Sequence, residues 1–104
     1  MTERPDTLLT LVVPAALEET VADLLLDATD IAVGFTTSLA SGHGATLELR
    51  RGNERVRGRG KRVKFEIALS SSSLAGLREH LCAELPDAKL YFWTTELRSC
   101  GVLP

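Results

Sequence analysis

The distribution of apolar residues along the chain predicts four strands and two helices. The clearest alternation runs through residues 62–69, where every odd position is a large apolar residue and Arg62, Lys64 and Glu66 fall between them. A period of two is typical of a strand with one buried and one open face. Three further strands are predicted from β-forming composition, over residues 7–13 (TLLTLVV), 31–40 (IAVGFTTSLA) and 90–97 (LYFWTTEL).

Two other segments carry leucine and valine at helical spacing. The first predicted helix covers residues 15–27 and begins behind Pro14, whose missing N–H costs nothing in a first turn. The second covers residues 74–84 and ends at Pro86. The four serines at 70–73 offer a side-chain cap for its first turn.

The order of these elements, β-α-β-β-α-β, predicts an α+β fold of the ferredoxin-like kind. In this sandwich a four-stranded antiparallel sheet carries two helices on one face. We expect one domain over residues 7–97, a disordered N-terminus at 1–6 and a C-terminal tail at 98–104. Ser41-Gly42-His43-Gly44 breaks the strand pattern and opens a predicted loop over about residues 42–60, a length typical of functional or disordered segments.

The sheet face away from the helices is predicted to mix charged and apolar groups. Its charged members come from residues 62–66, and its apolar members include Leu8 and Val12. The last strand adds either Tyr91 and Trp93 or Leu90 and Phe92, because alternation alone leaves both phases open. Such a face suits a contact between subunits with ion pairs across it, and a solvated face is the alternative.

Charge is concentrated in one segment, since eight of the twelve lysines and arginines lie between residues 50 and 64 of a chain whose net charge is −2. This stretch favours an electrostatic contact with phosphates or with an acidic partner. RNA is not expected, because the first strand carries no aromatic residue for base stacking and Phe65 is in phase with the core. No apolar run is long enough for a signal core or a membrane span, so we expect a cytoplasmic chain without direct membrane insertion. Cys82 and Cys100 are accordingly expected as reduced thiols.

Catalytic motifs are not found, so we expect a protein that is not an enzyme. The sequence contains no phosphate-binding P-loop and no nucleophile elbow. Metal-ligand pairs at helical or knuckle spacing are also missing, which leaves His43 as the metal-ligand candidate. The glycines that flank it expose backbone N–H groups able to cradle an anion, and Arg57 and Arg59 are candidate anion contacts.

Four stretches carry a resemblance to a known group of proteins. They are LLTLVVP (8–14), GFTTSLASGHG (34–44), VRGRGKRVKFEI (56–67) and YFWTTEL (91–97). With the predicted order of elements, they resemble the PII-like superfamily, which includes nitrogen-regulatory PII proteins and CutA divalent-ion tolerance proteins. The sequence is most similar to a PII-like bacterial family of unassigned function found near heavy-metal efflux pumps.

The resemblance implies a homotrimer with its sheets facing inward and its helices outside. It also implies that the loop at about 42–60 corresponds to the T-loop, with which PII proteins engage transporters, enzymes or regulators. In PII proteins, adenine nucleotides bind in clefts between subunits. The ligand-binding residues implied here are Gly42, His43, Gly44, Arg57, Arg59 and Lys89.

The chain departs from the nitrogen sensors in three places. Residues 85–89 (LPDAK) lack a glycine-rich phosphate cradle and retain only Lys89, the loop has no tyrosine to modify, and its base has Gly-His-Gly instead of a glycine-plus-glutamine pattern. We therefore expect a trimeric adaptor that binds an adenine nucleotide or a metal ion and regulates a partner, such as a metal-efflux transporter. A CutA-like divalent-metal-binding protein and a small ferredoxin-like dimeric enzyme are the alternatives.

Overall fold

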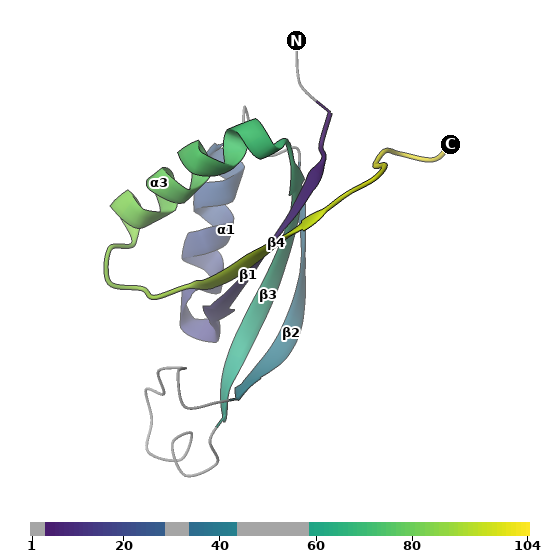
Figure 1. Ribbon diagram of the computed structural model, residues 1–104. Coiled ribbons are helices and arrows are strands. Elements are labelled where there is room, and N and C mark those ends of the chain that lie inside the picture. Colours follow the sequence, from purple (N-terminus) through teal and green to yellow (C-terminus); the bar gives the residue numbers. More distant parts are fainter. Residues whose placement is uncertain (1–3, 29–33, 44–58) are drawn as a thin grey trace.

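A computed structural model describes residues 4–28, 34–43 and 59–104 of the chain (Figure 1). Its strands and helices follow in the order β1 (Thr7–Pro14), α1 (Glu18–Asp27), β2 (Phe35–His43), β3 (Arg59–Leu69), α3 (Leu74–Glu84) and β4 (Tyr91–Glu96). A short 3₁₀ turn precedes each helix, at Ala15–Leu17 and at Ser71–Ser73. The second predicted helix is confirmed at both ends, and the first differs only in its 3₁₀ opening turn.

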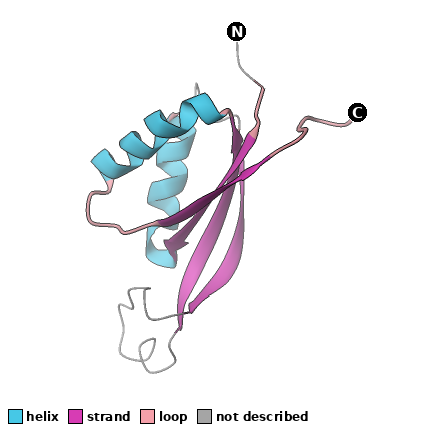
Figure 2. Cartoon of the chain, in the orientation of Figure 1, coloured by secondary structure: helices cyan, strands magenta, loops and turns pink. Residues whose placement is uncertain are grey.

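The four strands form one antiparallel sheet in the order β2-β3-β1-β4, and both helices lie on the same face of it (Figure 2). The strands β1 and β3 are central and pair along their length, from Thr7 opposite Leu69 to Pro14 opposite Arg62. The outer strands β2 and β4 each have one unpaired edge within the described residues. The predicted ferredoxin-like α+β arrangement is confirmed.

The core lies between the sheet and the helices and follows the alternation seen in the sequence. Odd-numbered residues of β1 and β3 point to the helices, and Leu9, Val13, Phe65 and Ile67 are fully buried there. Val21 of α1 and Leu77 of α3 close over them, and both are fully buried too. Each such side chain contributes about 1.5–3 kcal/mol of hydrophobic stabilisation, so this layer holds the sheet and helices together.

The strands β2 and β3 both extend further toward residues 44–58 than the sequence predicted. β2 continues through Ser41, Gly42 and His43, where a turn was expected, and β3 already begins at Arg59. The predicted turn is therefore wrong for residues 41–43, while Gly44 lies outside the described residues, as do residues 31–33 of the predicted second strand. Backbone hydrogen bonds between two strands do not require apolar side chains, so the ladder extends beyond the hydrophobic pattern.

The start of α3 is also capped differently from the prediction. The serine side chains make no capping hydrogen bond to the helix, and the Ser70 hydroxyl instead bonds the hydroxyls of Ser72 and Ser73. The backbone N–H of Ser71 donates to Oδ1 of Asp6 at 2.7 Å. Asp6 also pairs through its backbone with Leu69 on one side and Leu97 on the other. It therefore continues the pairing of β1, although it was predicted to belong to the N-terminal segment at residues 1–6.

Candidate functional site

The strands β2 and β3 continue beyond the rest of the sheet as a two-stranded ribbon. The last pair that β1 makes is Pro14 with Arg62, and three further β2–β3 pairs follow it. They are Ser41 opposite Lys61, Gly42 opposite Gly60 and His43 opposite Arg59. The ribbon thus carries two of the sequence's candidate ligand residues on directly opposed positions, at the place where the chain enters and leaves residues 44–58.

The pair of His43 and Arg59 ends the ribbon. Directly opposed residues of an antiparallel pair have Cβ atoms about 4.5–5.5 Å apart and share one face of the sheet. Both residue types carry N–H donors and bear positive charge, the arginine always and the histidine when protonated. The backbone register therefore sets two residue types that can bind an anion at directly opposed positions. His43 is exposed.

Below this pair, Gly60 makes room for the side chain of Arg62. A Cβ atom at Gly60 would lie 2.5 Å from Nη1 of Arg62. That same nitrogen donates a hydrogen bond to the carbonyl oxygen of Lys61 at 3.0 Å, and the Arg62 side chain is only 7% exposed. Arg62 is therefore folded against its own ribbon and covers it, instead of extending from the face as the alternation suggested.

Lys89 lies at the same end of the sheet but at the other edge. It precedes β4, whose first residue, Tyr91, pairs with Val12 of β1. Because β1 stands between β4 and the β2–β3 ribbon, adjacent strands being about 4.8 Å apart, one chain does not gather all the candidate residues into one site. Gly42, His43 and Arg59 come together, Lys89 is separate, and Gly44 and Arg57 lie outside the described residues.

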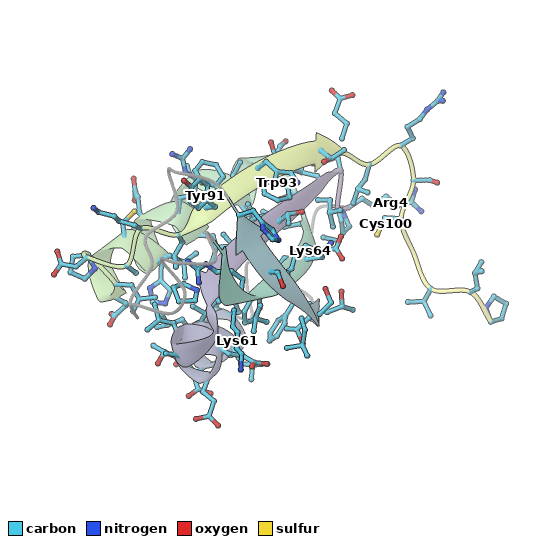
Figure 3. The ribbon with its side chains drawn as sticks, turned by 90° about the horizontal axis from the view of Figure 1, so that it is seen from below. Arg4, Lys61, Lys64, Tyr91, Trp93 and Cys100 are labelled. Atoms are coloured by element: carbon cyan, nitrogen blue, oxygen red, sulfur yellow. The ribbon has the colours of Figure 1, made fainter. Side chains whose placement is uncertain are left out.

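The sheet face opposite the helices carries an aromatic strip along β4. Trp93 lies beside Thr10 of β1, and Tyr91 lies beside Val12, whose other neighbour is Lys64 of β3 (Figure 3). No described helix covers this face, and Trp93 is 49% and Tyr91 37% exposed. Phe92 points to the helices, so the structure decides the phase that the sequence left open in favour of Tyr91 and Trp93.

Metal-binding and membrane-spanning features were sought in the described part of the chain. Within it, no group of three or more histidine, cysteine, aspartate or glutamate side chains is placed to hold a metal ion. The two cysteines, Cys82 and Cys100, are both free and exposed. Neither α1 nor α3 is long and apolar enough to cross a membrane.

Sequence reasoning missed Arg78, whose guanidinium carbon lies 4.6 Å from the centre of the Phe92 ring. This contact joins α3 to β4 beside a pocket that Cys82 also lines. The local signal was weak. Arg78 and Cys82 are four residues apart and so share a helix face, but the partner ring comes from a strand whose phase was not fixed.

Comparison with known proteins finds one matching family and several solved structures with the same fold. A family model described as a protein of unknown function, DUF3240, matches residues 3–104. The crystal structure of a DUF3240 family protein from Shewanella baltica OS155 has a TM-score of 0.79 at 19% identity, covering 98% of this chain and 100% of that one. Among curated protein sequences, none matches significantly.

Two further solved structures share the fold. CPII, a nitrogen regulatory PII-like protein from Thiomonas intermedia K12 bound to ADP, AMP and bicarbonate, has a TM-score of 0.70 at 17% identity, covering 95% of this chain and 97% of that one. CutA from Synechococcus elongatus PCC7942, complexed with Bis-Tris, has a TM-score of 0.71 at 14% identity, covering 98% and 89%. The resemblance to PII-like and CutA proteins that the sequence indicated is confirmed at the level of the fold.

Proposed function

The chain belongs to the DUF3240 family, and from this membership and its PII-like fold we propose that it acts as a homotrimeric signalling adaptor and not as an enzyme. Three copies meet through the open faces of their sheets. A small ligand binds at the junctions between copies, and residues 44–58 contact a protein partner.

The aromatic strip on the open sheet face is the observation that carries the proposal. Trp93 and Tyr91 are large rings of the kind enriched at protein interfaces, and in the single chain they lie half in solvent. Lys64 and Glu66 of β3, on the other side of β1 from the aromatic strip, add charges of both signs to the same face. In a trimer, the second and third copies bury this surface and can pair its charges. If the face were solvated, the rings would stay exposed and the charges would have no partner from another copy.

The ligand that suits the end of the ribbon is an adenine nucleotide. His43 and Arg59 are opposed there, and charged N–H donors form strong hydrogen bonds to phosphate oxygens. Lys89 belongs to the other edge of the sheet, so in this proposal a neighbouring copy supplies it to the same junction. Gly42, Gly44 and Arg57 complete the set. CPII, which shares the fold, was solved with ADP and AMP.

The partner we propose is a protein with an acidic surface, such as a metal-efflux transporter. Residues 44–58 contain four arginines and two glutamates, so the segment is basic. It joins the two strands that carry the His43–Arg59 pair. A nucleotide bound at that pair therefore contacts the base of the segment, and it changes partner affinity to the extent that it favours one arrangement of the segment over another.

Calorimetric titration of the intact protein with ADP and AMP tests the ligand, with Zn²⁺, Cu²⁺ and Co²⁺ as parallel titrants. We expect ADP or AMP to bind, and His43→Ala and Arg59→Ala each to weaken binding by about tenfold or more, the loss of a charged hydrogen bond. Arg98→Ala, which removes an exposed arginine from the C-terminal tail, is the matched control and should not change it.

Two results would overturn the nucleotide assignment. One is the lack of any nucleotide heat at millimolar concentration. The other is nucleotide binding that His43→Ala and Arg59→Ala leave unchanged. Binding of a divalent ion that is lost in His43→Ala would instead support direct metal binding, as proposed for the CutA-like alternative.

A further inference from the structure

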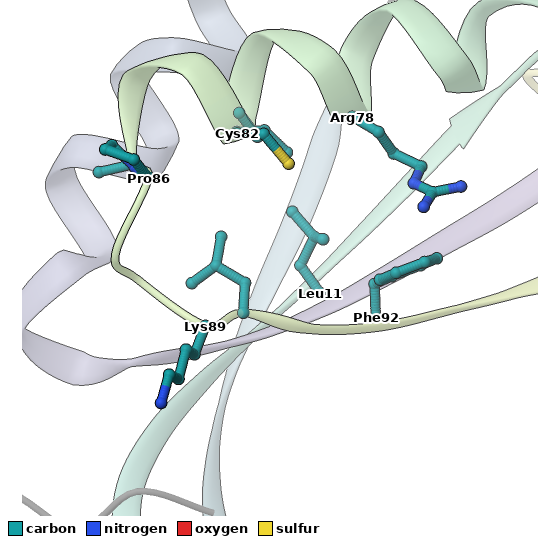
Figure 4. A pocket seen from close by; sticks show the side chains of 9 residues that line it. Leu11, Arg78, Cys82, Pro86, Lys89 and Phe92 are labelled. Carbon is teal, nitrogen blue, oxygen red and sulfur yellow. The ribbon is translucent and has the colours of Figure 1, made fainter.

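A pocket of about 290 Å³ lies between α3 and the start of β4, on the helix side of the sheet (Figure 4). Its volume is at the lower end of the range for small-molecule sites. The apolar wall comes from three parts of one chain and consists of Leu11, Leu81, Leu85, Leu90 and Phe92. The pocket is therefore separate from the open sheet face and needs no second copy to form it.

The charged side chains that line this pocket are both positive. They are Arg78 of α3 and Lys89 of the connection to β4, and the lining residues include no carboxylate. Figure 4 shows Arg78 reaching from the helix to the Phe92 ring at one end, and the sulfur of Cys82 pointing into the space between helix and strand. The Lys89 side chain leaves the other end and extends away from α3.

The contact of Arg78 with Phe92 leaves the guanidinium able to bind an anion. Its carbon lies 4.6 Å from the ring centroid, so the flat face of the group is used by the ring. The N–H donors of a guanidinium lie in its plane and match the two oxygens of a carboxylate. Among the described residues, no carboxylate forms an ion pair with Arg78.

The backbone at the lip of the pocket is strained. Lys89 has φ of 51°, the only positive value at a non-glycine position in the described chain. The Cβ atom of a non-glycine residue crowds the following carbonyl oxygen in this region, and such residues cluster at ligand-binding and active sites. The positive φ of Lys89 therefore shows, independently of the charges, that the surrounding structure holds the backbone at the pocket entrance in a fixed conformation.

From these observations we propose that the pocket binds a small carboxylic acid with an apolar body. The carboxylate pairs with the in-plane N–H groups of Arg78, and the apolar body lies against the leucines. Lys89 adds positive potential at the entrance. This site goes beyond the proposed adaptor function, because it lies within one chain and requires neither the trimer nor the nucleotide.

Cys82 supplies a built-in reporter for the test. The chain has two cysteines, so Cys100→Ser leaves the pocket thiol as the single reactive one. We expect octanoate to slow modification of Cys82 by a maleimide about tenfold at saturation, and more strongly than octan-1-ol or octylamine, which have the same apolar chain without the negative charge. In the Cys82→Ser protein, octanoate should leave modification of Cys100 unchanged.

Arg78→Gln, made in the Cys100→Ser background, tests the role of the charge. Arg78 is exposed, so the variant should fold, which circular dichroism checks. We expect octanoate affinity to fall about tenfold, the loss of a charge-assisted contact, while the weaker octanol protection is unchanged. Arg98→Gln in the same background is the control and should keep full octanoate affinity.

The proposal fails if octanoate gives no protection at millimolar concentration, or if octanoate and octylamine protect equally. It also fails if Arg78→Gln binds octanoate as well as the parent does. Trp93→Arg tests the pocket independently of the adaptor proposal, because this substitution alters the open sheet face and leaves the pocket lining intact. Octanoate protection should survive in that variant whether or not the protein is a trimer.

Discussion

Asp6 accepts a hydrogen bond from the backbone N–H of Ser71 at 2.7 Å, and so joins the start of β1 to the turn that opens α3. The hydroxyl of Ser71 donates to Oδ2 of Asp6 at 3.2 Å, and the hydroxyl of Thr7 donates to Oδ1, the oxygen that also accepts the Ser71 N–H, at 2.9 Å. These donors stabilise the ionised form. The Ser71 N–H and then the Thr7 hydroxyl lower the pKa of the Asp6 carboxyl from its ordinary value of 3.8.

Replacing Asp6 should therefore reduce stability in a pH-dependent manner. Because the folded-state pKa of Asp6 is below the unfolded value, its contribution is complete above the unfolded pKa and is lost as the pH falls through the folded pKa. We expect Asp6→Ala to lower the midpoint of urea unfolding at neutral pH. The difference from wild type should shrink as the pH falls below about 4.

Asp6→Asn is the control for this experiment. Its amide oxygen can still accept the Ser71 N–H, but the side chain does not titrate. The difference in midpoint between Asp6→Asn and Asp6→Ala should therefore stay constant across the same pH range. A wild-type advantage over Asp6→Ala that is equally constant with pH would contradict the assigned role of the carboxylate.

Two leucines provide a matched test of where the core lies. Leu9 of β1 is fully buried between sheet and helices, whereas Leu39 of β2 is 88% exposed. Leu9→Ala should cost about 2–5 kcal/mol, because it removes buried surface and leaves a cavity. Leu39→Ala should change stability by less than about 0.5 kcal/mol. Chemical denaturation measures both, and equal costs would contradict the described packing.

The close approach of Arg62 to Gly60 predicts a coupling between the two positions. In the wild-type background, Gly60→Ala forces the Arg62 guanidinium away from the ribbon, since the added Cβ would lie 2.5 Å from Nη1. In an Arg62→Ala background the same change should stabilise by about 0.5–1 kcal/mol, because alanine loses less backbone entropy in a strand than glycine. A double-mutant cycle by urea denaturation measures the difference.

A coupling energy of zero in that cycle would show that the two residues do not interact. Gly76→Ala provides a comparison on α3, because a Cβ at Gly76 would meet nothing within 4 Å. It should stabilise the protein by about 0.5–1 kcal/mol in both backgrounds, since alanine is the better helix former. A different effect of Gly76→Ala in the two backgrounds would indicate a general change in the protein and not a local contact.

The parts of the fold that local sequence could predict are those set by side-chain periodicity. The alternation from Val63 to Leu69 fixed the central strand and its buried face, and the leucine spacing fixed α3 from Leu74 to Glu84. The far end of β2 was missed, because Ser41, Gly42 and His43 carry no apolar pattern. These residues are strand only because β3 pairs with them, and pairing between distant segments leaves no local signal.

The sequence allowed us to predict which residues belong to the candidate site, but not how they are arranged in space. The sequence singled out His43 and Arg59, and the register of β2 and β3 places them opposite each other. Lys89 was grouped with them through resemblance alone, and the strand order sets it at the other edge of the sheet. The hydrogen bond between Asp6 and the 3₁₀ turn before α3 could not be foreseen, because the carboxylate and the Ser71 N–H that it binds are 65 positions apart in the sequence.

Native mass spectrometry shows whether three copies meet through the aromatic strip on the open sheet face. We expect a particle of three times the 11.3 kDa chain mass for wild type, and a single-chain mass for Trp93→Arg. Leu26→Arg, which places the same charge on an exposed leucine of α1, should leave the trimer intact. A single-chain mass for wild type, or a trimer that Trp93→Arg does not disturb, would contradict the account.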